Sequence, residues 1–478
     1  MSLEWNLENI ALALGCEPVR TGEARSASGV SIDSRTLRAG EIFVCVRGDR
    51  TDGHLYIPDA RAAGAAALIV EERFLTGGGE AVDSPVGGPA VFAVENGLGA
   101  LQDLARFHRT RITAPVLAIT GSNGKTSARE MTAGLAARLL GEDRVHATRG
   151  NLNNHFGAPL SLLGANLEHE LIVLELGMNH AGEIALLSEI VRPDQALVTS
   201  IAGAHMEFFD SLEDIARAKL EIVKGMTSGA RLLWNSDAIG REEVLRESSR
   251  RGIQPVFFGF HAGPGTTEVG HDLQVSAAGV HFEWRGHRVQ NQQYFTEAMA
   301  SNLLGSLALL TNAGFEAGDL AVAASGLRPS TGRRFEAVRL GTGQLLIDDT
   351  YNANEASFVS SIQGLRKILP GAQLGLFAGP MAELGSWSEE AHRAVARAAA
   401  AADYVFLGVC GGVLAEVLKE EFERAAPGAR VLQANDATEL ARLALDQGYL
   451  EGLQGILVKG SRSARMDLVS DAIRARDA

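Results

Sequence analysis

Cysteine is scarce in this chain, and its few cysteines are poorly placed for covalent or metal chemistry. Cys16, Cys45 and Cys410 are odd in number, far apart and outside any Cys-x-x-Cys spacing. We therefore expect neither a disulfide framework nor a cysteine zinc site, but buried thiols in a reducing compartment. The segment 1–10 also lacks a basic stretch followed by an apolar run, so no signal peptide is predicted and the cytoplasm is the expected location.

Long apolar runs and an excess of positive charge are missing as well. No uninterrupted apolar stretch approaches the roughly 20 residues that a helix needs to cross a membrane, so no membrane span is expected. The formal net charge is −14, which argues against nucleic acid as a partner, because phosphate backbones favour clustered Lys and Arg. Any anionic substrate must then be held by local cations or by backbone amides.

The length and the remaining composition are those of a globular protein with several domains. The chain has 478 residues, of which 46% are hydrophobic and 21% are charged. Because a domain usually holds roughly 100–200 residues, about three domains are expected. Each would be long enough to bury a core of its own.

Strand-like and helix-like segments alternate along most of the chain. Residues 1–110 mix short β-like runs with an alanine-rich helical stretch. From Pro115 onward the alternation becomes regular, which is typical of a parallel sheet covered by helices on both faces. The strands expected in this part are 116–119, 171–174 and 195–200, and helices are expected after Gly124, near Glu183 and from Leu212.

Two segments interrupt this rhythm. Between His271 and Phe295, polar and apolar residues alternate around Gly279 and Gly286, which predicts antiparallel hairpins added to the parallel core. A helix is expected over 298–310, and the segment 328–333 indicates a hinge. Beyond it, strands are expected at 345–347, 374–377, 404–407 and 456–458. The predicted fold class is α/β with three domains, at 1–110, 111–331 and 332–478.

The segment Thr120-Gly121-Ser122-Asn123-Gly124-Lys125-Thr126 carries the clearest chemical signal. It lies between an apolar strand and a helix-compatible run, so a phosphate would meet the free N–H groups and the dipole of a helix N-terminus. Two glycines would let the backbone curl around the phosphates. Lys125 would reach the β- and γ-phosphates of ATP, and the Thr126 hydroxyl would ligate magnesium.

The match to a phosphate-binding loop is to a short variant. The strict pattern has a glycine where this chain has Ile119, so what remains is T-G-S-N-G-K-T. A chance glycine-rich turn is the alternative. The position directly between strand and helix favours the nucleotide-binding interpretation.

Acidic and basic side chains follow the strands beside this loop. Glu175 stands at the end of the strand 171–174, and His205 and Glu207 follow the next strand. The carboxyl ends of parallel strands border the ligand crevice of an open sheet, so these groups could hold a metal ion there. A helix cap or a surface acid is the alternative for Glu175. Lys219, in the helical run 215–223, has the pattern of a solvated charged face.

Several short strings together resemble the Mur ligase family. In the central part these are T-G-S-N-G-K-T (120–126), N-L-N-N-H-F-G (151–157), E-L-G-M-N (175–179), A-H-M-E (204–207) and A-K-L-E (218–221). S-I-D-S-R (31–35) and D-G-H (52–54) are similar to that family's nucleotide-sugar-binding domain. D-D-T-Y-N-A-N (348–354), M-A-E-L-G (381–385) and K-G-S-R (459–462) are similar to its carboxy-terminal domain. The resemblance covers nearly the whole chain.

The resemblance implies an ATP-dependent amide ligase of peptidoglycan precursor synthesis. The strings D-D-x-Y-N-A-N and M-x-E-L-G are most like the branch that adds D-alanyl-D-alanine to UDP-N-acetylmuramoyl-tripeptide. ATP would phosphorylate the terminal carboxylate of the tripeptide, and the amine of the dipeptide would attack the acyl phosphate. Magnesium, as two ions, and fixed cations would stabilise the charge that develops in both steps. A monomer is expected.

The resemblance also implies which residues would act on ATP and magnesium. Magnesium would be held by Thr126, Glu175, His205 and a carbamylated Lys219, because only a carbamate turns a lysine into an anionic ligand. The catalytic residues would be Lys125, Lys219, His205 and Arg333. ATP would be bound by Gly121, Ser122, Asn123, Gly124, Lys125, Thr126, Asn302, Arg333, Asp349 and Tyr351.

The two other substrates would be bound on either side of the ATP-binding domain. Residues 1–110 would bind the UDP-sugar and residues 332–478 the dipeptide. The UDP-substrate residues would be Ser34, Arg35, Asn151, Asn153 and Asn154, and the dipeptide residues Asn352, Glu383, Leu384 and Ser461. Turn residues are the alternative for the three asparagines.

The sequence departs from the family pattern in places, and other functions remain open. Ala298 stands where the family commonly has a histidine, Glu355 where a proline is usual, and Pro380 where an aspartate is commoner. One alternative is another ligase of the superfamily, but the D-N-P-R string of the enzyme that adds the third amino acid is absent. A folylpolyglutamate synthase should lack the amino-terminal domain. The alternative of another class is a protein that hydrolyses ATP only to change shape.

Overall fold

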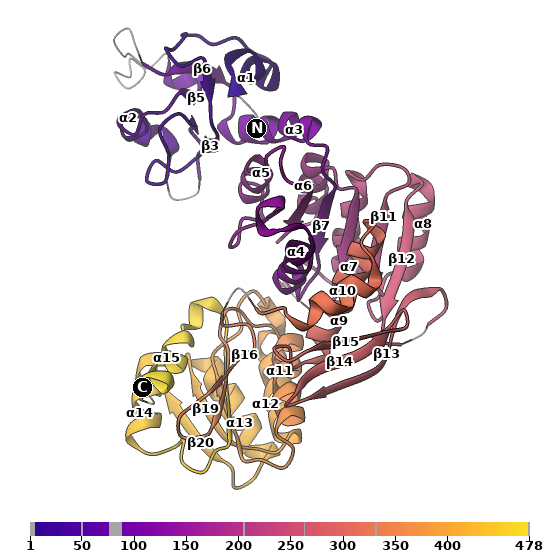
Figure 1. The fold of residues 1–478 in the computed structure, drawn as a ribbon. Helices are drawn as coiled ribbons and strands as arrows, with labels where there is room; N and C mark the ends of the chain where they lie inside the picture. The colour runs from indigo at the N-terminus through magenta and orange to yellow at the C-terminus, as the bar shows by residue number, and fades with distance from the viewer. Residues whose placement is uncertain are drawn as a thin grey trace.

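Four β-sheets organise the chain in the computed structural model, which describes residues 5–48, 51–75, 88–203, 206–261, 263–329 and 332–476. The four-stranded N-terminal sheet and the six-stranded C-terminal sheet lie at opposite ends of the molecule, and the nine-stranded sheet lies between them (Figure 1). Helices accompany the three larger sheets. The α/β fold class predicted from the sequence is confirmed.

The N-terminal sheet is small and parallel, in the order β3-β4-β5-β6. Its elements are β3 (Val30–Ser31), β4 (Ile42–Val44), β5 (Ala67–Glu71), β6 (Ala90–Val94), α1 (Leu7–Leu14), α2 (Ile57–Ala62) and the 3-10 helices Gly53–Tyr56 and Glu72–Phe74. A two-stranded antiparallel sheet joins β1 (Trp5–Asn6) to β2 (Ser26–Ala27). Helix α3 (Gly97–Arg111) leads to the central sheet, where it packs on α5 and α6.

The central sheet has the order β15-β14-β13-β12-β11-β10-β7-β9-β8. Its strands are β7 (Val116–Thr120), β8 (Val145–Ala147), β9 (Leu171–Glu175), β10 (Gln195–Val198), β11 (Arg231–Asn235), β12 (Gln254–Gly259), β13 (Thr266–Ser276), β14 (Gly279–Trp284) and β15 (His287–Asn291). The strands from β8 to β13 run parallel, and β13, β14 and β15 form the antiparallel hairpins expected from the alternation in 271–295.

Helices cover both faces of this sheet, which is why the middle positions of its inner parallel strands are apolar on both faces. Leu117 and Ile119 of β7 face one layer, and Val116 and Ala118 face the other. The helices are α4 (Lys125–Leu140), α5 (Gly157–Leu163), α6 (Glu183–Val191), α7 (Leu212–Leu220), α8 (Arg241–Arg251), α9 (Glu297–Asn312), α10 (Ala317–Ser325) and the 3-10 helices Glu142–Arg144 and Glu221–Lys224.

The strand order places β7 between β9 and β10. The chain leaves β7 toward β8 and β9 on one side and returns to β10 on the other, so the carboxyl end of β7 lies at the point where the winding reverses. Such a switch point opens a crevice outside the strand ends. The segment 120–126 follows β7 directly and therefore lies in that crevice.

The C-terminal sheet has the order β16-β17-β21-β18-β19-β20, and all pairs but β16-β17 are parallel. Its strands are β16 (Glu336–Arg339), β17 (Leu345–Asp349), β18 (Leu374–Ala378), β19 (Tyr404–Cys410), β20 (Arg430–Ala434) and β21 (Gly455–Lys459). Its helices are α11 (Glu355–Ile368), α12 (Ser388–Ala401), α13 (Val413–Ala425), α14 (Ala437–Asp446), α15 (Asp467–Arg476) and the 3-10 helices Gly385–Trp387 and Arg462–Ala464.

The helical run predicted over 215–223 ends earlier than expected, for a tertiary reason. Helix α7 stops at Leu220 and tightens into the 3-10 helix Glu221–Lys224. The Glu221 carboxylate accepts hydrogen bonds from the Gly182 and Ala185 N–H groups at the start of α6. Gly225 follows, where a Cβ would collide with the Ser188 carbonyl. Close approach to α6 therefore sets the end of α7.

The other predicted elements agree with the structure within a few residues, although the strand expected over 195–200 already ends at Val198. No helix in the described part of the chain is long and apolar enough to cross a membrane. The division into three functional domains at residues 110 and 331 stays a prediction.

Candidate functional site

The loop after β7 has the backbone of a phosphate cradle. Gly121 and Gly124 have φ angles of +147° and +81°, which residues with a side chain rarely adopt. A Cβ on Gly124 would lie 2.5 Å from Asn302 Nδ2, and one on Gly121 would collide with the Thr199 hydroxyl. Helix α4 begins directly after Gly124, at Lys125, so its free N–H groups point into the crevice.

The end of β10 holds this loop from the side. The Asn123 N–H donates to Ser200 Oγ at 3.0 Å, and Thr199 Oγ1 donates to the Asn123 carbonyl at 2.6 Å. Ser122 Oγ donates to the Ala202 carbonyl at 2.9 Å. Side chains that directly follow a neighbouring strand therefore help to hold the loop in this shape.

Lys125 supplies a positive charge at the base of the cradle. Its Nζ donates to the carbonyls of Gly121 at 2.8 Å and Ser122 at 3.1 Å. Burial lowers the pKa of Lys125, while the nearby Glu175 carboxylate acts in the opposite direction and Arg334 adds to the lowering. Phosphate oxygens would compensate this buried charge better than two carbonyls do.

Glu175 ends β9 and keeps one oxygen available. Its Oε1 accepts from Asn153 Nδ2 at 2.7 Å, and its N–H donates to Thr148 Oγ1 at 3.0 Å. The other oxygen, Oε2, is buried and has no hydrogen-bond partner among the described residues, with Arg129 Nε at 3.7 Å. A buried carboxylate oxygen without a donor is suited to a cation.

Lys219 is far more buried than its charge pattern suggested, with only 1% of the residue exposed. Its Nζ has no hydrogen-bond partner within the described ranges. Burial and the neighbouring Lys125 hold the pKa of Lys219 well below its usual value, against weaker opposing effects of Glu183 and Glu221. His205, which was predicted to act with Lys219, lies outside the described residues.

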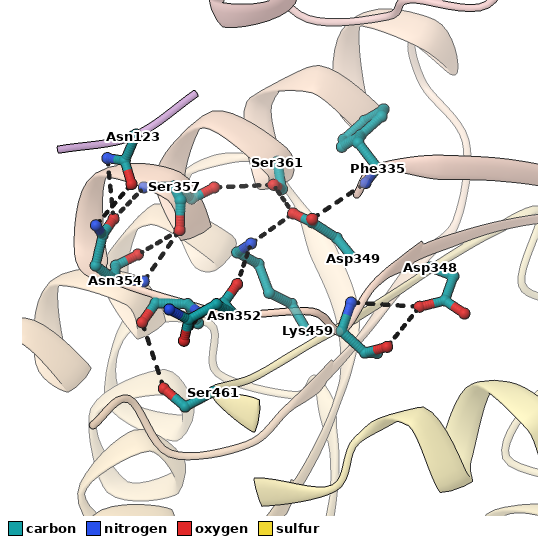
Figure 2. A network of polar contacts seen from close by, with 12 residues as sticks. Asn123, Phe335, Asp348, Asp349, Asn352, Asn354, Ser357, Ser361, Lys459 and Ser461 are labelled. Atoms are coloured by element: carbon teal, nitrogen blue, oxygen red, sulfur yellow. Dashed lines mark hydrogen bonds and ion pairs between the residues drawn. The ribbon is translucent and has the colours of Figure 1, made fainter. Parts of the chain in front are cut away.

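The edge of the C-terminal sheet faces the loop with its own polar network, shown in Figure 2. The Asp349 carboxylate, at the end of β17, accepts from Phe335 N–H at 3.1 Å, Ser361 Oγ at 2.6 Å and Lys459 Nζ at 2.5 Å. Lys459 Nζ also donates to the Asn352 carbonyl at 3.2 Å. Asp349 thus orders the strand ends of this sheet in addition to any contact with nucleotide.

Two asparagines join the loop to the C-terminal sheet. Asn123 Nδ2 donates to Asn354 Oδ1 at 3.2 Å, and Asn354 Nδ2 donates back to Asn123 Oδ1 at 2.7 Å (Figure 2). Asn354 is also the N-cap of α11, in a capping box with Ser357. This reciprocal amide pair is a direct link between the nucleotide loop and the C-terminal sheet.

A cavity of about 1110 Å³ lies between the central sheet and the C-terminal sheet. It is lined from both sides, so its size depends on how the two parts approach each other. The predicted site residues that line it are Ser122, Asn123, Gly124, Lys125, Thr126, Asn151, Asn153, Asn154, Glu175, Asn302, Asp349, Tyr351, Asn352, Glu383 and Leu384.

The structure places the two arginines of the hinge differently with respect to this cavity. Arg333 points away from it and pairs with Asp471 at 2.9 Å. Arg334 lines the cavity instead and donates to Thr126 Oγ1 at 3.1 Å. Its guanidinium lies 3.8 Å from the centre of the Tyr351 ring. Carboxylates on α15 attract Arg333, which the local sequence could not reveal.

Two predicted UDP-substrate residues lie away from the cavity, and others are already engaged. Ser34 and Arg35 belong to the N-terminal part, where Arg35 is exposed and pairs with Asp33 at 2.6 Å. Asn154 Oδ1 accepts from the Phe156 and Gly157 N–H groups, which is the turn role left open above. Asn153 orients Glu175, as described, and Asn151 lines the cavity without a described hydrogen bond of its side chain.

The predicted dipeptide residues cluster at the strand ends of the C-terminal sheet. Ser461 Oγ accepts from the Ala382 N–H at 2.8 Å, and Ser461 is buried beneath the cavity wall. Glu383 has a φ of +62°, and its carbonyl accepts from the Glu207 N–H of the central part at 3.4 Å. The structure therefore brings Asn352, Glu383 and Leu384 to the cavity and leaves Ser461 behind it.

Sequence reasoning missed several residues of the cavity, and three of them make contacts described above. Arg334 is the second arginine of G-R-R, Lys459 opens K-G-S-R, and Asn354 closes N-A-N. Lys459 and Asn354 belong to strings that were recognised, whereas Arg334 lies one residue beyond the predicted hinge segment 328–333. Choosing among the members of each string needed the tertiary contacts.

Comparison with known proteins gives the same family along the whole chain. Residues 26–108 match "Mur ligase family, catalytic domain", residues 119–310 match "Mur ligase middle domain", and residues 333–462 match "Mur ligase, glutamate ligase domain". The UDP-N-acetylmuramoyl-tripeptide--D-alanyl-D-alanine ligase of Bacillus subtilis is 32% identical over 94% of this chain and 93% of its own length. The Escherichia coli ligase of the same name is 32% identical over 95% and 96%.

Solved structures agree with the fold. MurF from Acinetobacter baumannii superposes with a TM-score of 0.85 at 24% identity and covers 99% of both chains. MurF ligase from Thermotoga maritima in complex with ADP superposes with a TM-score of 0.75 at 28% identity, over 94% of this chain and 97% of that one.

Replacement of Asn354 by serine tests the amide pair. Serine keeps an N-cap of similar quality for α11 but cannot form the reciprocal amide pair with Asn123. We expect kcat/KM for ATP to fall about fivefold in Asn354→Ser, because the link contributes about 1 kcal/mol. The matched control is Asn96→Ser at the N-cap of α3, which should keep the wild-type value. If the losses in kcat/KM of the single variants Asn123→Ala and Asn354→Ser multiply in full in the double variant, the two side chains act independently. That result would contradict the pairing.

Proposed function

The chain belongs to the Mur ligase family, and on that basis we propose that it joins D-alanyl-D-alanine to UDP-N-acetylmuramoyl-tripeptide with ATP. The observation that carries the proposal is the shared cavity between the two sheets. A phosphate loop with Lys125 forms one wall, and strand ends bearing Arg334 and Lys459 form the other. A reaction that consumes ATP and unites two further substrates needs such a junction. The relatives named for this ligation support the choice of substrates.

The first step activates a carboxylate. The γ-phosphoryl group of ATP moves to a carboxylate oxygen of the tripeptide, which gives an acyl phosphate and ADP. Lys125 Nζ lies at the Gly121 and Ser122 carbonyls and Arg334 donates to the Thr126 hydroxyl, so both cations lie at the loop where phosphate oxygens would bind. Their charges would stabilise the negative charge on the transferred group, and the planar fork of Arg334 could pair with two oxygens at once.

The second step forms the amide. The unprotonated amine of the dipeptide attacks the carbonyl carbon, a tetrahedral oxyanion forms, and it collapses with departure of phosphate and loss of one proton from nitrogen. Fixed cations near the carbonyl would stabilise that oxyanion. The strand ends with Asn352, Glu383 and Leu384 line the same cavity, so an amine held there could approach the acyl group.

Magnesium fits the group of oxygens beside the loop. Bound between phosphates and protein, it would neutralise charge on the phosphate oxygens. Thr126 Oγ1 and Glu175 Oε2, which accepts no hydrogen bond from the described residues, are the hard oxygen donors that this ion prefers. No group of three His, Cys, Asp or Glu side chains within the described residues could hold a metal alone, so phosphates and water would complete the coordination, as magnesium commonly requires.

A carbamate on Lys219 would add an anionic ligand at a second position. The buried amine lacks a hydrogen-bond partner among the described residues, and its lowered pKa favours the neutral form. A neutral amine is the form that adds to carbon dioxide, and the product would carry a negative charge toward Lys125.

We further assign residues 1–110 to the UDP-sugar, with Ser34 and Arg35, and residues 332–478 to the dipeptide. The protein is proposed to act as a monomer in the cytoplasm.

Release of ADP from purified protein tests the proposed ligation. Sustained ADP release, beyond about one equivalent per enzyme, should require ATP, UDP-N-acetylmuramoyl-tripeptide and D-alanyl-D-alanine together. A panel of amines should include single amino acids, to which the proposal assigns no activity. Equal ADP release without the tripeptide would indicate a nucleotide-driven switch, and activity with a single amino acid alone would contradict the dipeptide assignment.

Lys219→Ala tests the carbamate. Loss of a ligand at the phosphates should lower kcat about a hundredfold or more, and short carboxylic acids should restore part of it. The exposed Lys224 on the next turn offers a matched control, and Lys224→Ala should stay active. Wild-type protein equilibrated with isotopically labelled bicarbonate should show a carbamate carbon signal that Lys219→Ala lacks. Active wild-type enzyme with an unmodified amine by mass and no such signal would refute it.

A further inference from the structure

The two consecutive arginines of the hinge point in opposite directions. Arg334 donates to Thr126 Oγ1 in the cavity, while Arg333 donates to both carboxylate oxygens of Asp471 at 2.9 and 3.0 Å. Arg333 Nη1 also lies 3.7 Å from Asp467. Both acids belong to α15, near the end of the chain. The side chain of Arg333 thus links the hinge to α15, which packs on the C-terminal sheet.

The backbone at this point is held in an unusual conformation. Arg333 and Phe335 have φ angles of +66° and +53°, a region that residues with a Cβ seldom occupy without outside support. The support is visible in three hydrogen bonds. Arg333 N–H donates to Glu336 Oε2 at 3.0 Å, Tyr351 N–H donates to the Arg333 carbonyl at 3.1 Å, and Phe335 N–H donates to Asp349 Oδ1.

Helix α15 braces the same segment a second time. Arg474, one turn after Asp471, lies 3.3 Å from Glu336 and 3.0 Å from the buried Asp348. Glu336 is the acceptor of the Arg333 N–H, so α15 holds the hinge through both the side chain and the backbone of Arg333. The backbone N–H of Tyr351 donates to the Arg333 carbonyl, and the Tyr351 ring packs on the guanidinium of Arg334.

We propose that Arg333 is a positioning residue, whose ion pair with Asp471 and Asp467 on α15 directs Arg334 toward the nucleotide phosphates. The inference rests on the proposed function, because it assigns Arg334 to the γ-phosphate of ATP. Without the ion pair between Arg333 and α15, the backbone can rotate about the strained φ angles of Arg333 and Phe335. The Arg334 side chain then no longer points toward Thr126. Helix α15, which contributes no residue to the cavity lining, then becomes part of the arrangement that binds ATP.

The geometry separates this role from a role in stability. Asp471 is about half exposed, with 52% of its side chain accessible, and ion pairs at such a position contribute little to the free energy of unfolding. Removal of the pair should therefore leave the melting temperature almost unchanged. It should instead change the orientation of Arg334 at the phosphates. The affinity for a nucleotide with a third phosphate reports that change.

Titration of the intact protein with magnesium and two nucleotides tests the proposal. The probes are ADP and a non-hydrolysable ATP analogue, which differ in the γ-phosphate. In Arg333→Ala, and independently in Asp471→Ala, affinity for the analogue should fall about tenfold while affinity for ADP stays near wild type. Asp471→Ala leaves the hinge residues themselves unchanged, so it guards against local misfolding. Arg442→Ala removes an exposed Arg–Asp pair on α14 and should change neither affinity.

The route through Arg334 is tested by combining variants. Arg333→Ala should cause no further loss in an Arg334→Ala background, because the residue that it positions is already gone. Additive losses there, equal losses for ADP and the analogue, or wild-type affinities in Asp471→Ala would each overturn the proposal. The titration needs no ligation. A protein that shows the predicted nucleotide affinities but releases no ADP with the three substrates would refute the proposed function alone.

Discussion

Close packing of the loop 121–124 against the end of β10 and against α9 is the constraint on which the site depends. Gly121 and Gly124 are in contact with Thr199 and Asn302, where no larger residue fits. The loop therefore has one shape, and its N–H groups converge where α4 begins. Because β7 lies between β9 and β10, that shape also decides which neighbours reach the phosphates. Glu175 comes from one side and Thr199 and Ser200 from the other.

The second half of the site comes from a different sheet and is joined to the first by a few polar contacts. The Asn123–Asn354 pair, the Arg334–Thr126 hydrogen bond and the Glu207–Glu383 backbone hydrogen bond all cross the cavity. Each is modest in energy, on the order of 1 kcal/mol. Opening for substrates and closure over ATP would break and remake these polar contacts. Lys367 and Glu297 add an exposed ion pair across the same junction.

The sequence was most informative where local pattern and position coincide. Apolar runs predicted the strands of the central sheet, and the rule that ligands gather at carboxyl ends of parallel strands pointed to Glu175 and the loop 120–126. The sequence was least informative where a distant partner decides. Arg333 and Arg334 are equivalent as neighbours, and Asp471, 138 residues away, determines which one faces the cavity. Lys219 had the pattern of a solvated helix face, and only the packing of α7 against α6 shows that it is buried.

The central claim is that this junction activates a carboxylate by phosphoryl transfer before an amide forms. The most direct measurement follows the oxygen atoms of the tripeptide carboxylate, labelled with the heavy isotope of oxygen, through one complete reaction. Because the bridging oxygen of the acyl phosphate comes from the carboxylate and leaves with the phosphate when the amine attacks carbon, one labelled oxygen should appear in the inorganic phosphate for each amide formed. Unlabelled phosphate, released alongside product or without it, would contradict the account.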